Sequence, residues 1–274
     1  MTYKITSEEI NLISPFIENL TGLVLDHSKD YLFNSRLNPV LEKYSLQNFV
    51  SLIEASTLNK NIERDIIDAI TTKETMFFRD KHPFEFIQNR FFPDFFEKKG
   101  FSSEINIWSA ASSTGQEVYS IAFTLYNILF DLTKYNVNLI ATDISDEALK
   151  KASRGFYTNF ELSRGLNGNQ INRYFNTSET GGKIKDEIRQ SVQFKTINLI
   201  KPYPQDLKKM DLIFCRNVAI YFSRRDRIKL YDKLADQLNS GGVLIISSTE
   251  SLLGICERFE KKVFRNTFYY QLID

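Results

Sequence analysis

The chain has 274 residues, of which 42% are hydrophobic and 25% are charged, and its formal net charge at pH 7 is +1. This composition is that of an ordinary globular protein, and the near-neutral charge gives no indication that the chain binds nucleic acid or an acidic membrane surface. No apolar run reaches the ~18 residues that a transmembrane helix needs, and the first residues lack the pattern of a signal peptide, so a cytoplasmic protein is expected.

The first seventy residues predict a small helical domain. Thr6 can cap a first helix with apolar residues at helical spacing, and Gly22 ends it. A second helix is expected over 29–37, where Asn38 and Pro39 should force a kink or a restart. Two further amphipathic segments cover 46–55 and 62–70. This region holds six basic and ten acidic residues, giving −4 and leaving +5 for the remainder, which supports a boundary near residue 70.

Strands and helices alternate after a linking segment, 71–79, and a Phe-rich helix, 83–98. The expected strands are 105–110, 137–142, 211–215 and 242–248, the expected helices are 116–131, 145–153 and 224–238, and a hairpin of 259–264 and 268–273 closes the chain. This alternation predicts an α/β fold with a doubly wound, largely parallel sheet, to which the hairpin adds an antiparallel edge. The interval 155–198 is polar, holds Gly165, Gly168, Gly181 and Gly182 and interrupts the alternation, so a small inserted β-subdomain is expected there.

The turn between the first strand and its helix is the most informative segment. An apolar run from Ile105 breaks into small residues around Gly115 and then opens an amphipathic helix. Such a turn lies where open α/β sheets bind nucleotide-like ligands, and its small residues allow close approach of the backbone. Because the segment is not G-x-G-x-x-G, a nucleoside without a pyrophosphate is favoured over a dinucleotide.

Polar residues follow the other parallel strands. Asp143 ends the second strand and can accept both hydroxyls of a ribose; it could instead cap the next helix, but Ser145 is the better candidate for that cap. Asn198, with the adjacent N–H of Leu199, could read an adenine edge or serve only as a turn residue. Arg216 and Asn217 follow the strand 211–215. In a doubly wound sheet these strand ends converge on one crevice.

Two further side chains are candidates for contact with a substrate. Tyr221 follows that same strand end, although a tyrosine in an apolar run is more often a core residue. Arg79 closes the linking segment beside Met76, Phe77 and Phe78, and an arginine next to buried aromatic residues needs an anion or a route to water. A carboxylate of a ligand or substrate would provide that anion.

The cysteines and histidines indicate no metal site. Cys215 and Cys256 lie in apolar segments without C-x-x-C spacing and are interpreted as reduced core thiols. His27 and His82 are the only histidines, too few for a zinc site with the available partners.

With these residues in place, the chain resembles the CheR-type chemoreceptor glutamate methyltransferases, the chemotaxis protein methyltransferases, which use S-adenosylmethionine. The likeness covers nearly the whole chain. It rests on four blocks in this order: Thr71–Arg79, Trp108–Ser120, Ala141–Ile144 and Ile213–Phe222. The resemblance implies a Rossmann-like class I methyltransferase sheet over 71–274, with the insertion at about 155–198 and a helical receptor-docking domain over 1–70.

The resemblance also implies the site residues. Those lining the S-adenosylmethionine site would be Thr75, Arg79, Glu117, Asp143, Asn198, Leu199, Arg216 and Asn217. Asp143 would take the ribose hydroxyls, and Asn198 and Leu199 would border the adenine. Arg79 and Tyr221 would lie nearest the transferred methyl group and the incoming glutamate, as the catalytic pair. Lys73 stands where the family usually has an asparagine and is counted as a further member of the cofactor site.

The activity implied by the resemblance is methylation of glutamate side chains in the helical cytoplasmic region of chemoreceptors. The products are glutamyl methyl esters and S-adenosylhomocysteine. Lys29, Arg36 and Lys43 recur every seven residues and would form one basic docking stripe if their helix continued through Pro39, although the domain as a whole is negative. The segment 176–183 is short, which suggests a member that works without a receptor tether. Two alternatives are a non-catalytic cofactor-binding signalling module and a methyltransferase for another protein or a small carboxylate.

Overall fold

Local sequence signals set both ends of the first helix, α1 (Ser7–Thr21). The Thr6 hydroxyl accepts the Glu9 N–H at 3.2 Å, and the Glu9 carboxylate accepts the Thr6 N–H at 3.0 Å, which is a reciprocal capping box. Gly22 ends the helix with φ +84°. A Cβ at Gly22 would lie 2.8 Å from the Ile200 side chain and 2.9 Å from the Phe222 ring. Glycine at this position therefore permits both the left-handed backbone that ends the helix and the close approach of Ile200 and Phe222.

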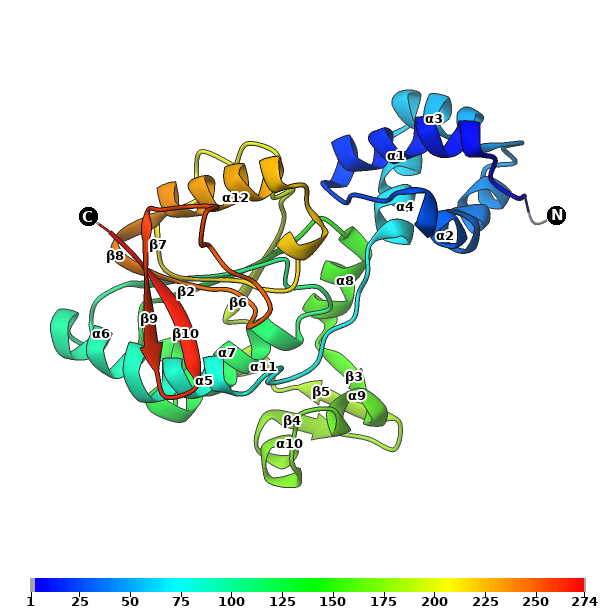
Figure 1. The fold of residues 1–274 in the computed structure, drawn as a ribbon. Coiled ribbons are helices and arrows are strands. Elements are labelled where there is room, and N and C mark those ends of the chain that lie inside the picture. Colours follow the sequence, from blue (N-terminus) through cyan, green and yellow to red (C-terminus); the bar gives the residue numbers. More distant parts are fainter. Residues whose placement is uncertain (1–2, 274) are drawn as a thin grey trace.

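Three more helices complete the N-terminal part of the computed structural model, which describes residues 3–273. They are α2 (Asp30–Lys43), preceded by the 3₁₀ turn η1 (His27–Lys29), α3 (Phe49–Leu58) and α4 (Lys60–Ile70). Together with α1 they enclose a core of their own, whose fully buried members include Ile13, Ile17, Phe33, Leu37 and Ile66. Figure 1 shows this part, in blue, to one side of the sheet.

The expected restart at Pro39 is wrong, because α2 continues through this residue to Lys43. A proline inside a helix removes one hydrogen bond and costs about 3 kcal/mol. The buried face of α2 continues beyond it with Val40 and Leu41, and each fully buried side chain of this type stabilises by roughly 1.5–3 kcal/mol. Packing on the apolar face therefore outweighs the local preference for a break.

The main sheet has seven strands in the order β6-β2-β1-β7-β8-β10-β9. Its strands are β1 (Ile105–Ala110), β2 (Val137–Asp143), β6 (Val192–Thr196), β7 (Met210–Cys215), β8 (Leu238–Ile245), β9 (Phe259–Phe264) and β10 (Thr267–Leu272). β6, β2, β1, β7 and β8 pair in parallel, and β10 adds the antiparallel edge with β9. The predicted α/β fold class is confirmed.

Helices cover both faces of this sheet. Its principal helices are α5 (His82–Phe86), α6 (Phe92–Lys99), α7 (Gln116–Leu129), α8 (Asp146–Arg154) and α12 (Arg224–Asp236). The Phe-rich helix contains one π-helical turn, η2 (Ile87–Phe91), between α5 and α6. In Figure 1, α12 lies above the sheet, and α6 and α7 lie below it. No helix among residues 3–273 is long and apolar enough to cross a membrane.

Besides small shifts at helix ends, two larger differences from the sequence expectation concern β8 and the polar interval. β8 begins at Leu238 rather than 242 and ends at Ile245, because an irregularity in its pairing with β7, near Gly241 at φ +69°, lets it start earlier. The polar interval forms a separate three-stranded sheet in the order β3-β5-β4. Its elements are β3 (Phe156–Thr158), α9 (Asn159–Ser163), α10 (Gly168–Tyr174), β4 (Phe175–Thr177), β5 (Gly181–Ile184) and α11 (Asp186–Arg189). The segment from Val192 belongs instead to the main sheet, as β6.

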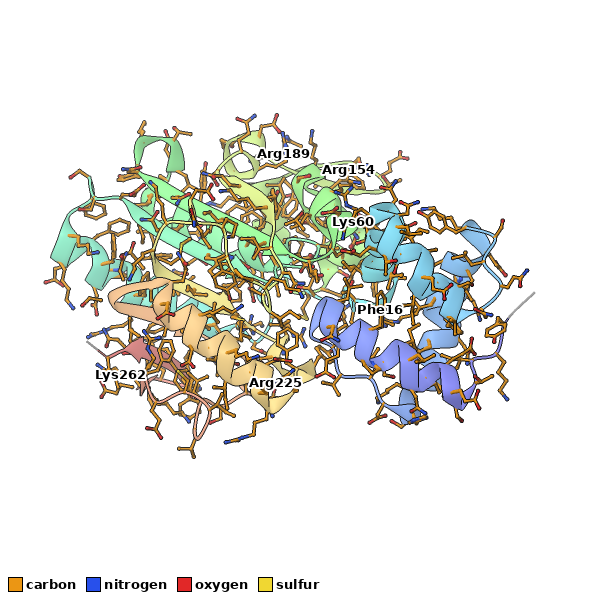
Figure 2. The ribbon with its side chains drawn as sticks, turned by 90° about the horizontal axis from the view of Figure 1, so that it is seen from above. Phe16, Lys60, Arg154, Arg189, Arg225 and Lys262 are labelled. Atoms are coloured by element: carbon orange, nitrogen blue, oxygen red, sulfur yellow. The ribbon has the colours of Figure 1, made fainter. Side chains whose placement is uncertain are left out.

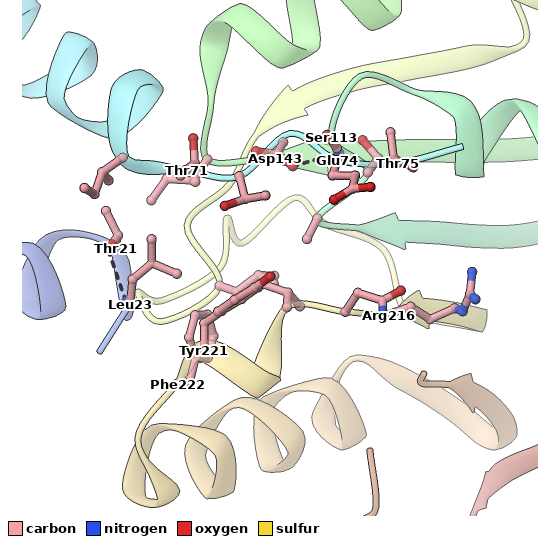
Figure 3. A pocket seen from close by; sticks show the side chains of 18 of the residues that line it. Thr21, Leu23, Thr71, Glu74, Thr75, Ser113, Asp143, Arg216, Tyr221 and Phe222 are labelled. Atoms are coloured by element: carbon pink, nitrogen blue, oxygen red, sulfur yellow. Dashed lines mark hydrogen bonds between the residues drawn. The ribbon is translucent and has the colours of Figure 1, made fainter. Parts of the chain in front are cut away.

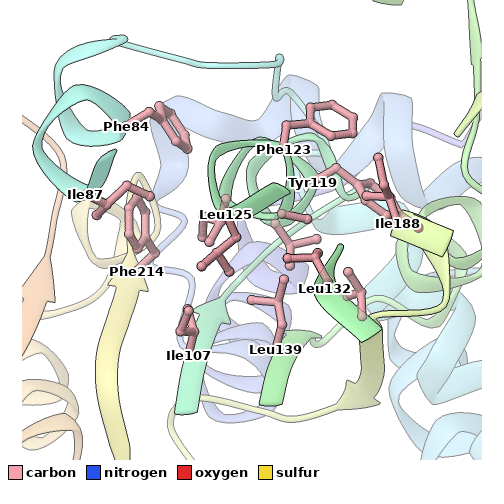
Figure 4. Close-up of a cluster of buried hydrophobic side chains, with 14 of the residues drawn as sticks. Phe84, Ile87, Ile107, Tyr119, Phe123, Leu125, Leu132, Leu139, Ile188 and Phe214 are labelled. Carbon is pink, nitrogen blue, oxygen red and sulfur yellow. The ribbon is translucent and has the colours of Figure 1, made fainter. Parts of the chain in front are cut away.

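Aromatic packing fixes the segment that joins the two parts. On one face of the sheet, α7 contributes Tyr119 and Phe123 to a large apolar cluster that also holds Ile107, Leu139 and Phe214 (Figure 4). The fully buried Phe77 enters the same cluster. Its ring centroid lies 4.9 Å from that of Tyr157 and 6.1 Å from that of Phe123. The linking segment is therefore anchored in the core immediately before Arg79.

The helical part meets the sheet part at the start of α12. Seen from above, Arg225 at that end of α12 lies toward α1, on which Phe16 is labelled (Figure 2). The contact of Gly22 with Phe222 and a hydrogen bond from the Val24 N–H to the Tyr221 carbonyl, at 2.9 Å, belong to this junction. Leu23 packs against both the helical core and the core beneath α12.

Candidate functional site

A cavity of about 380 Å³ lies between the helical part and the carboxyl ends of the parallel strands (Figure 3). This volume is within the usual range for small-molecule sites. The residues that follow β1, β2, β6 and β7 all line it, so the predicted convergence of these strand ends is confirmed. Of the predicted site residues, these line the cavity: Thr75, Arg79, Glu117, Asp143, Asn198, Leu199, Arg216, Asn217 and Tyr221.

The turn after β1 has an unusual backbone. Ala111, Ser113 and Gly115 adopt φ of +61°, +51° and +97°, and such alternation directs successive N–H groups into one concavity. Ser112 and Ser113 line the cavity, and their hydroxyl groups have no hydrogen-bond partner among the described residues. Both hydroxyl oxygens are buried, so the backbone N–H groups of this turn are the better candidates for contact with a polar ligand.

Gly115 has a different role from the one expected. It does not line the cavity. A Cβ here would lie 2.8 Å from the Ala152 Cβ and 2.9 Å from the Tyr157 hydroxyl. The glycine therefore allows α7 to pack closely against α8 and the insertion, and it does not bring the backbone toward a ligand.

Asp143 ends β2 with its carboxylate held from two sides. Oδ2 accepts the Ser113 N–H at 2.8 Å, and Oδ1 accepts the Ser145 N–H at 2.9 Å. Burial raises the pKa of this carboxyl, and these backbone donors oppose the rise without cancelling it. Ser145 caps α8, because its hydroxyl accepts the Ala148 N–H at 3.1 Å. Asp143 is therefore not the cap, and the acceptor capacity that remains on its carboxylate can serve a diol.

Arg216 ties three elements together at the floor of the cavity. Its side chain is only 1% exposed. One guanidinium nitrogen lies 2.9 Å from a Glu117 carboxylate oxygen, and the other lies 2.6 Å from Asp80 and 3.0 Å from the Arg79 carbonyl oxygen. Glu117 also accepts the Ser109 hydroxyl at 2.9 Å. Arg216 thereby fixes the backbone of Arg79.

The linking segment is bent sharply around this contact. Phe78, Asp80 and Lys81 have φ of +50°, +66° and +43°, and non-glycine residues of this kind are held only by surrounding structure. Among residues 3–273, the Arg79 side chain makes only a long 3.4 Å hydrogen bond, to the Glu74 carbonyl. Its guanidinium therefore retains donors for an anion in the cavity.

Asn217 is held by a residue that the sequence did not identify. Its φ is +59°, its N–H donates to Glu250 at 3.1 Å, and its amide donates to the Ser247 hydroxyl at 3.0 Å. Burial raises the pKa of Glu250. Glu250 follows β8, and its only sequence signal is its place just after a strand of the parallel sheet.

The loop after β6 connects the cavity to α1. The Asn198 amide donates to the Leu20 carbonyl at 2.9 Å, and its oxygen accepts the Ile200 N–H at 3.1 Å. In this arrangement the Asn198 side chain joins the two parts of the molecule, and its role toward an adenine stays a prediction. Lys233 on α12 donates to the carbonyls of Leu199 and Lys201. Leu199 itself is buried and gives the cavity an apolar wall.

Tyr221 stands at the open side of the cavity. It lies in the 3₁₀ turn η4 (Ala219–Tyr221), and the residue is 44% exposed. In Figure 3 its ring reaches into the cavity from the side of the wall that follows β7. Because the ring is not enclosed, Tyr221 is not a core residue, which was the alternative to a role in contact with a substrate.

Lys73 lies outside the lining of the cavity. Its ammonium pairs with the Glu147 carboxylate on α8. The Lys73 charge also opposes the rise in the pKa of the Asp143 carboxyl. The membership of Lys73 in the cofactor site stays a prediction.

The proposed basic stripe is also not a single free surface. The Arg36 guanidinium donates to the carbonyls of Ile70 and Thr71, at 2.9 and 3.1 Å. Lys43 pairs with Asp65 at 2.5 Å, and Lys29 lines the cavity. Although the helix continues through Pro39, the side chains of Arg36 and Lys43 are already bonded to acceptors within the helical part or the start of the linking segment.

Several lining residues come from the helical part and were missed. They are Thr21, Leu23, Val24, Leu25, Tyr31, Leu32, Arg36 and Ile70. No motif marks them, because they reach the cavity only through the packing of one part on the other. The apolar run that follows Gly22 is the one local signal that this loop is covered.

Comparison with known proteins gives a consistent result. Residues 73–268 match the family described as "CheR methyltransferase, SAM binding domain". A "Chemotaxis protein methyltransferase" of Vibrio parahaemolyticus is 38% identical over 261 residues, which cover 93% of this chain and 94% of that protein. A protein of the same description from Vibrio anguillarum is 39% identical over the same shares. The "Chemotaxis protein methyltransferase 1" of Pseudomonas aeruginosa is 34% identical, covering 92% and 93%.

Proposed function

Because this chain belongs to the CheR methyltransferase family, we propose that it methylates glutamate side chains of chemoreceptors and forms glutamyl methyl esters. Its membership establishes a methyltransferase that uses S-adenosylmethionine. The observation that carries the finer proposal is the presence of Arg79 and Tyr221 on the same cavity as Asp143. These three side chains give one site with a diol acceptor, a cation and a hydroxyl donor.

The residues of the cavity fit the cofactor. A carboxylate fixed by two N–H groups suits the ribose hydroxyls, which Asp143 would hold. The apolar wall at Leu199 suits one face of the adenine. The left-handed turn at Ala111 and Ser113 would offer backbone N–H groups as further polar contacts. Thr75 and Glu117 would complete the lining, with Arg216 and Asn217 holding the cavity in shape.

The reaction needs positioning more than proton transfer. S-adenosylmethionine supplies a methyl group on a sulfonium, which a carboxylate oxygen can displace. A glutamate is already ionised at pH 7, because its ordinary pKa is ~4.3. Arg79 would hold that carboxylate, and Tyr221 would orient it through a hydrogen bond, while the cavity walls exclude water. Very tight binding of the carboxylate by Arg79 would not speed the step, because it would stabilise the ground state equally.

The helical part would supply the receptor contact. It borders the cavity through Leu25, Lys29 and Tyr31, so a receptor helix that brings a glutamate to Tyr221 must pass next to it. A small free carboxylate would need no such surface. This arrangement favours a protein acceptor over free glutamate.

The first test is calorimetric titration with S-adenosylhomocysteine. We expect wild-type protein to bind it and Asp143→Ala to lose most of the affinity, because the ribose would lose its charged acceptor. Retention of full affinity in folded Asp143→Ala would reject this role. Absence of binding to folded wild-type protein would count against the assignment of the cavity.

The second test is transfer of labelled methyl from S-adenosylmethionine to a purified cytoplasmic receptor fragment. We expect transfer to the fragment and none to free glutamate. Arg79→Ala and Tyr221→Phe should each lower turnover by on the order of tenfold, the effect of one lost hydrogen bond near the reacting atoms. Arg90→Ala and Tyr269→Phe, whose residues do not line the cavity, are the matched controls. Unchanged turnover in both site variants would reject the catalytic roles of Arg79 and Tyr221. Binding of S-adenosylhomocysteine without any methyl transfer would favour a signalling module.

A further inference from the structure

We propose that Asp68, on α4 of the helical part, is a positioning residue of the cofactor site that fixes the turn holding Asp143. The inference rests on the proposed role of Asp143 in binding the ribose. It assigns to the helical part a function in cofactor binding that is separate from contact with a receptor.

Asp68 is bonded to the beginning of α8. Its Oδ1 accepts the hydroxyl of Ser145 at 2.5 Å and the N–H of Glu147 at 3.3 Å. Ser145 is completely buried, and its oxygen in turn accepts the Ala148 N–H at 3.1 Å. The single proton of this hydroxyl is therefore directed to a residue 77 positions earlier in the chain.

From Ser145 the contact continues to the ribose acceptor. The Ser145 N–H donates to Oδ1 of Asp143 at 2.9 Å, while Ser113 holds the other carboxylate oxygen. The side chain of Ser145 thus faces Asp68, and its backbone faces Asp143. Hydrogen bonds to an ionised acceptor are about twice as strong as neutral ones, so Asp68 can restrain the orientation of this turn. A carboxylate at the N-terminus of α8 is also favoured by the helix dipole.

Other contacts between α4, the linking segment and α8 have less influence on the turn. Arg64 lies 3.5 Å from Asp146, and Lys73 pairs with Glu147. The Arg64 and Glu147 side chains are 64% and 69% exposed, and exposed ion pairs of this kind stabilise little. Of these contacts between described residues, only that of Asp68 reaches a buried group that is itself bonded to Asp143.

The experiment is titration of the full-length chain with S-adenosylhomocysteine. We expect Asp68→Ala to raise the dissociation constant by about tenfold, the usual effect of one lost charge-assisted hydrogen bond. Asp68→Asn keeps an acceptor oxygen and should restore affinity to within about threefold of wild type. Asp65→Ala is the matched control: Asp65 lies on the same helix but bonds Lys43 and Tyr44, at 2.5 and 2.7 Å. This control should bind normally.

Unchanged affinity in Asp68→Ala would overturn the proposal. So would an equal loss in Asp65→Ala, which would indicate general loosening of α4, or failure of Asp68→Asn to restore binding. If Asp68→Ala does not fold, Ser145→Ala tests the same contact from α8. Ser145→Thr is its control, because threonine keeps the hydroxyl. Equal affinities in those two variants would also overturn the proposal. Loss of binding in Asp143→Ala with normal binding in Asp68→Ala would reject only this inference, whereas normal binding in Asp143→Ala would reject the proposed role of Asp143 itself.

Discussion

At the scale of single residues, the ionisation of Asp143 links the structure to a measurable pH dependence. Burial raises the pKa of this carboxyl above its ordinary value of 3.8. The ionised form is the better acceptor for ribose hydroxyls. Protonation therefore opposes binding, and it should begin at a higher pH than it would for an exposed aspartate.

We expect the affinity for S-adenosylhomocysteine to fall as the pH is lowered from neutrality through this raised pKa. Calorimetric titrations across that range would measure the effect, and Asp143→Asn should bind weakly without this pH dependence. The stability of the ligand-free protein should depend on pH in the opposite direction from the binding affinity. The contribution of Asp143 to the free energy of unfolding is present below the unfolded-state pKa and is lost as the pH rises through the raised one. An identical pH dependence of binding in the wild-type and Asn variants would contradict the assignment.

Arg216 should be required for stability as well as for the shape of the site. Removing one partner of a buried ion pair leaves the other uncompensated and costs about 3–5 kcal/mol. Because Asp80 is partly exposed, we expect Arg216→Met to lower the free energy of unfolding by about 3 kcal/mol in urea titrations. Arg258→Ala removes an exposed pair with Asp236, 2.7 Å long, and should cost less than about 1 kcal/mol. Similar losses in the two variants would show that Arg216 is not an essential brace.

At the scale of elements, Gly22 couples the end of α1 to the wall of the cavity. We expect Gly22→Ala to lower the free energy of unfolding by more than about 2 kcal/mol, because it combines a left-handed backbone with overpacking. The added methyl group would meet Ile200 and Phe222. Chemical denaturation of purified protein measures the change.

Two glycine variants separate the causes of that loss. Gly254 has φ +66° and no atom within 4 Å of an added Cβ, so Gly254→Ala should show only the backbone cost of about 1 kcal/mol. Gly168 begins α10 without a positive φ and also has open space, so Gly168→Ala should be neutral or slightly stabilising. Equal losses at Gly22 and Gly254 would mean that the contact with the second part contributes nothing.

Elements with strong local signals could be predicted from the sequence. The strand, turn and helix from Ile105 to Leu129 have uninterrupted periodicity, and Thr6 and Gly22 carry specific capping chemistry. The path of α2 through Pro39 could not be predicted, because burial of Val40 and Leu41 by other helices decides it. The assignment of β6 to the main sheet likewise depends on its pairing with β2.

The same distinction applies to the candidate site. Asp143, Arg216 and Tyr221 follow strand ends and could be placed together by the topology of the sheet. Arg36 and Asp68 could not, because their contacts cross from helices with no motif. Lys73 does not line the cavity, although Thr72 and Glu74 beside it do, because its own side chain reaches an acid on α8.

At the scale of the whole molecule, the cavity is shared by two parts with separate cores. The helical part encloses one core, and two more lie on opposite faces of the main sheet. Leu23 packs on both the helical core and the core on the α12 face. A ligand that contacts both parts should therefore stabilise their junction, because it binds only when the junction is formed.

We expect saturation with S-adenosylhomocysteine to slow hydrogen exchange at the junction as well as around Asp143. The Val24 N–H, bonded to the Tyr221 carbonyl at 2.9 Å, is the reporter, and the β9–β10 hairpin, which does not line the cavity, is the internal control. At a free ligand concentration of 100 times the dissociation constant, the free energy of unfolding should rise by about 2.7 kcal/mol. Exchange that proceeds by local opening should slow at Val24 and remain unchanged in the hairpin. Protection confined to the sheet part would show that ligand binding does not depend on the helical part, and it would also remove the physical basis for the role of Asp68.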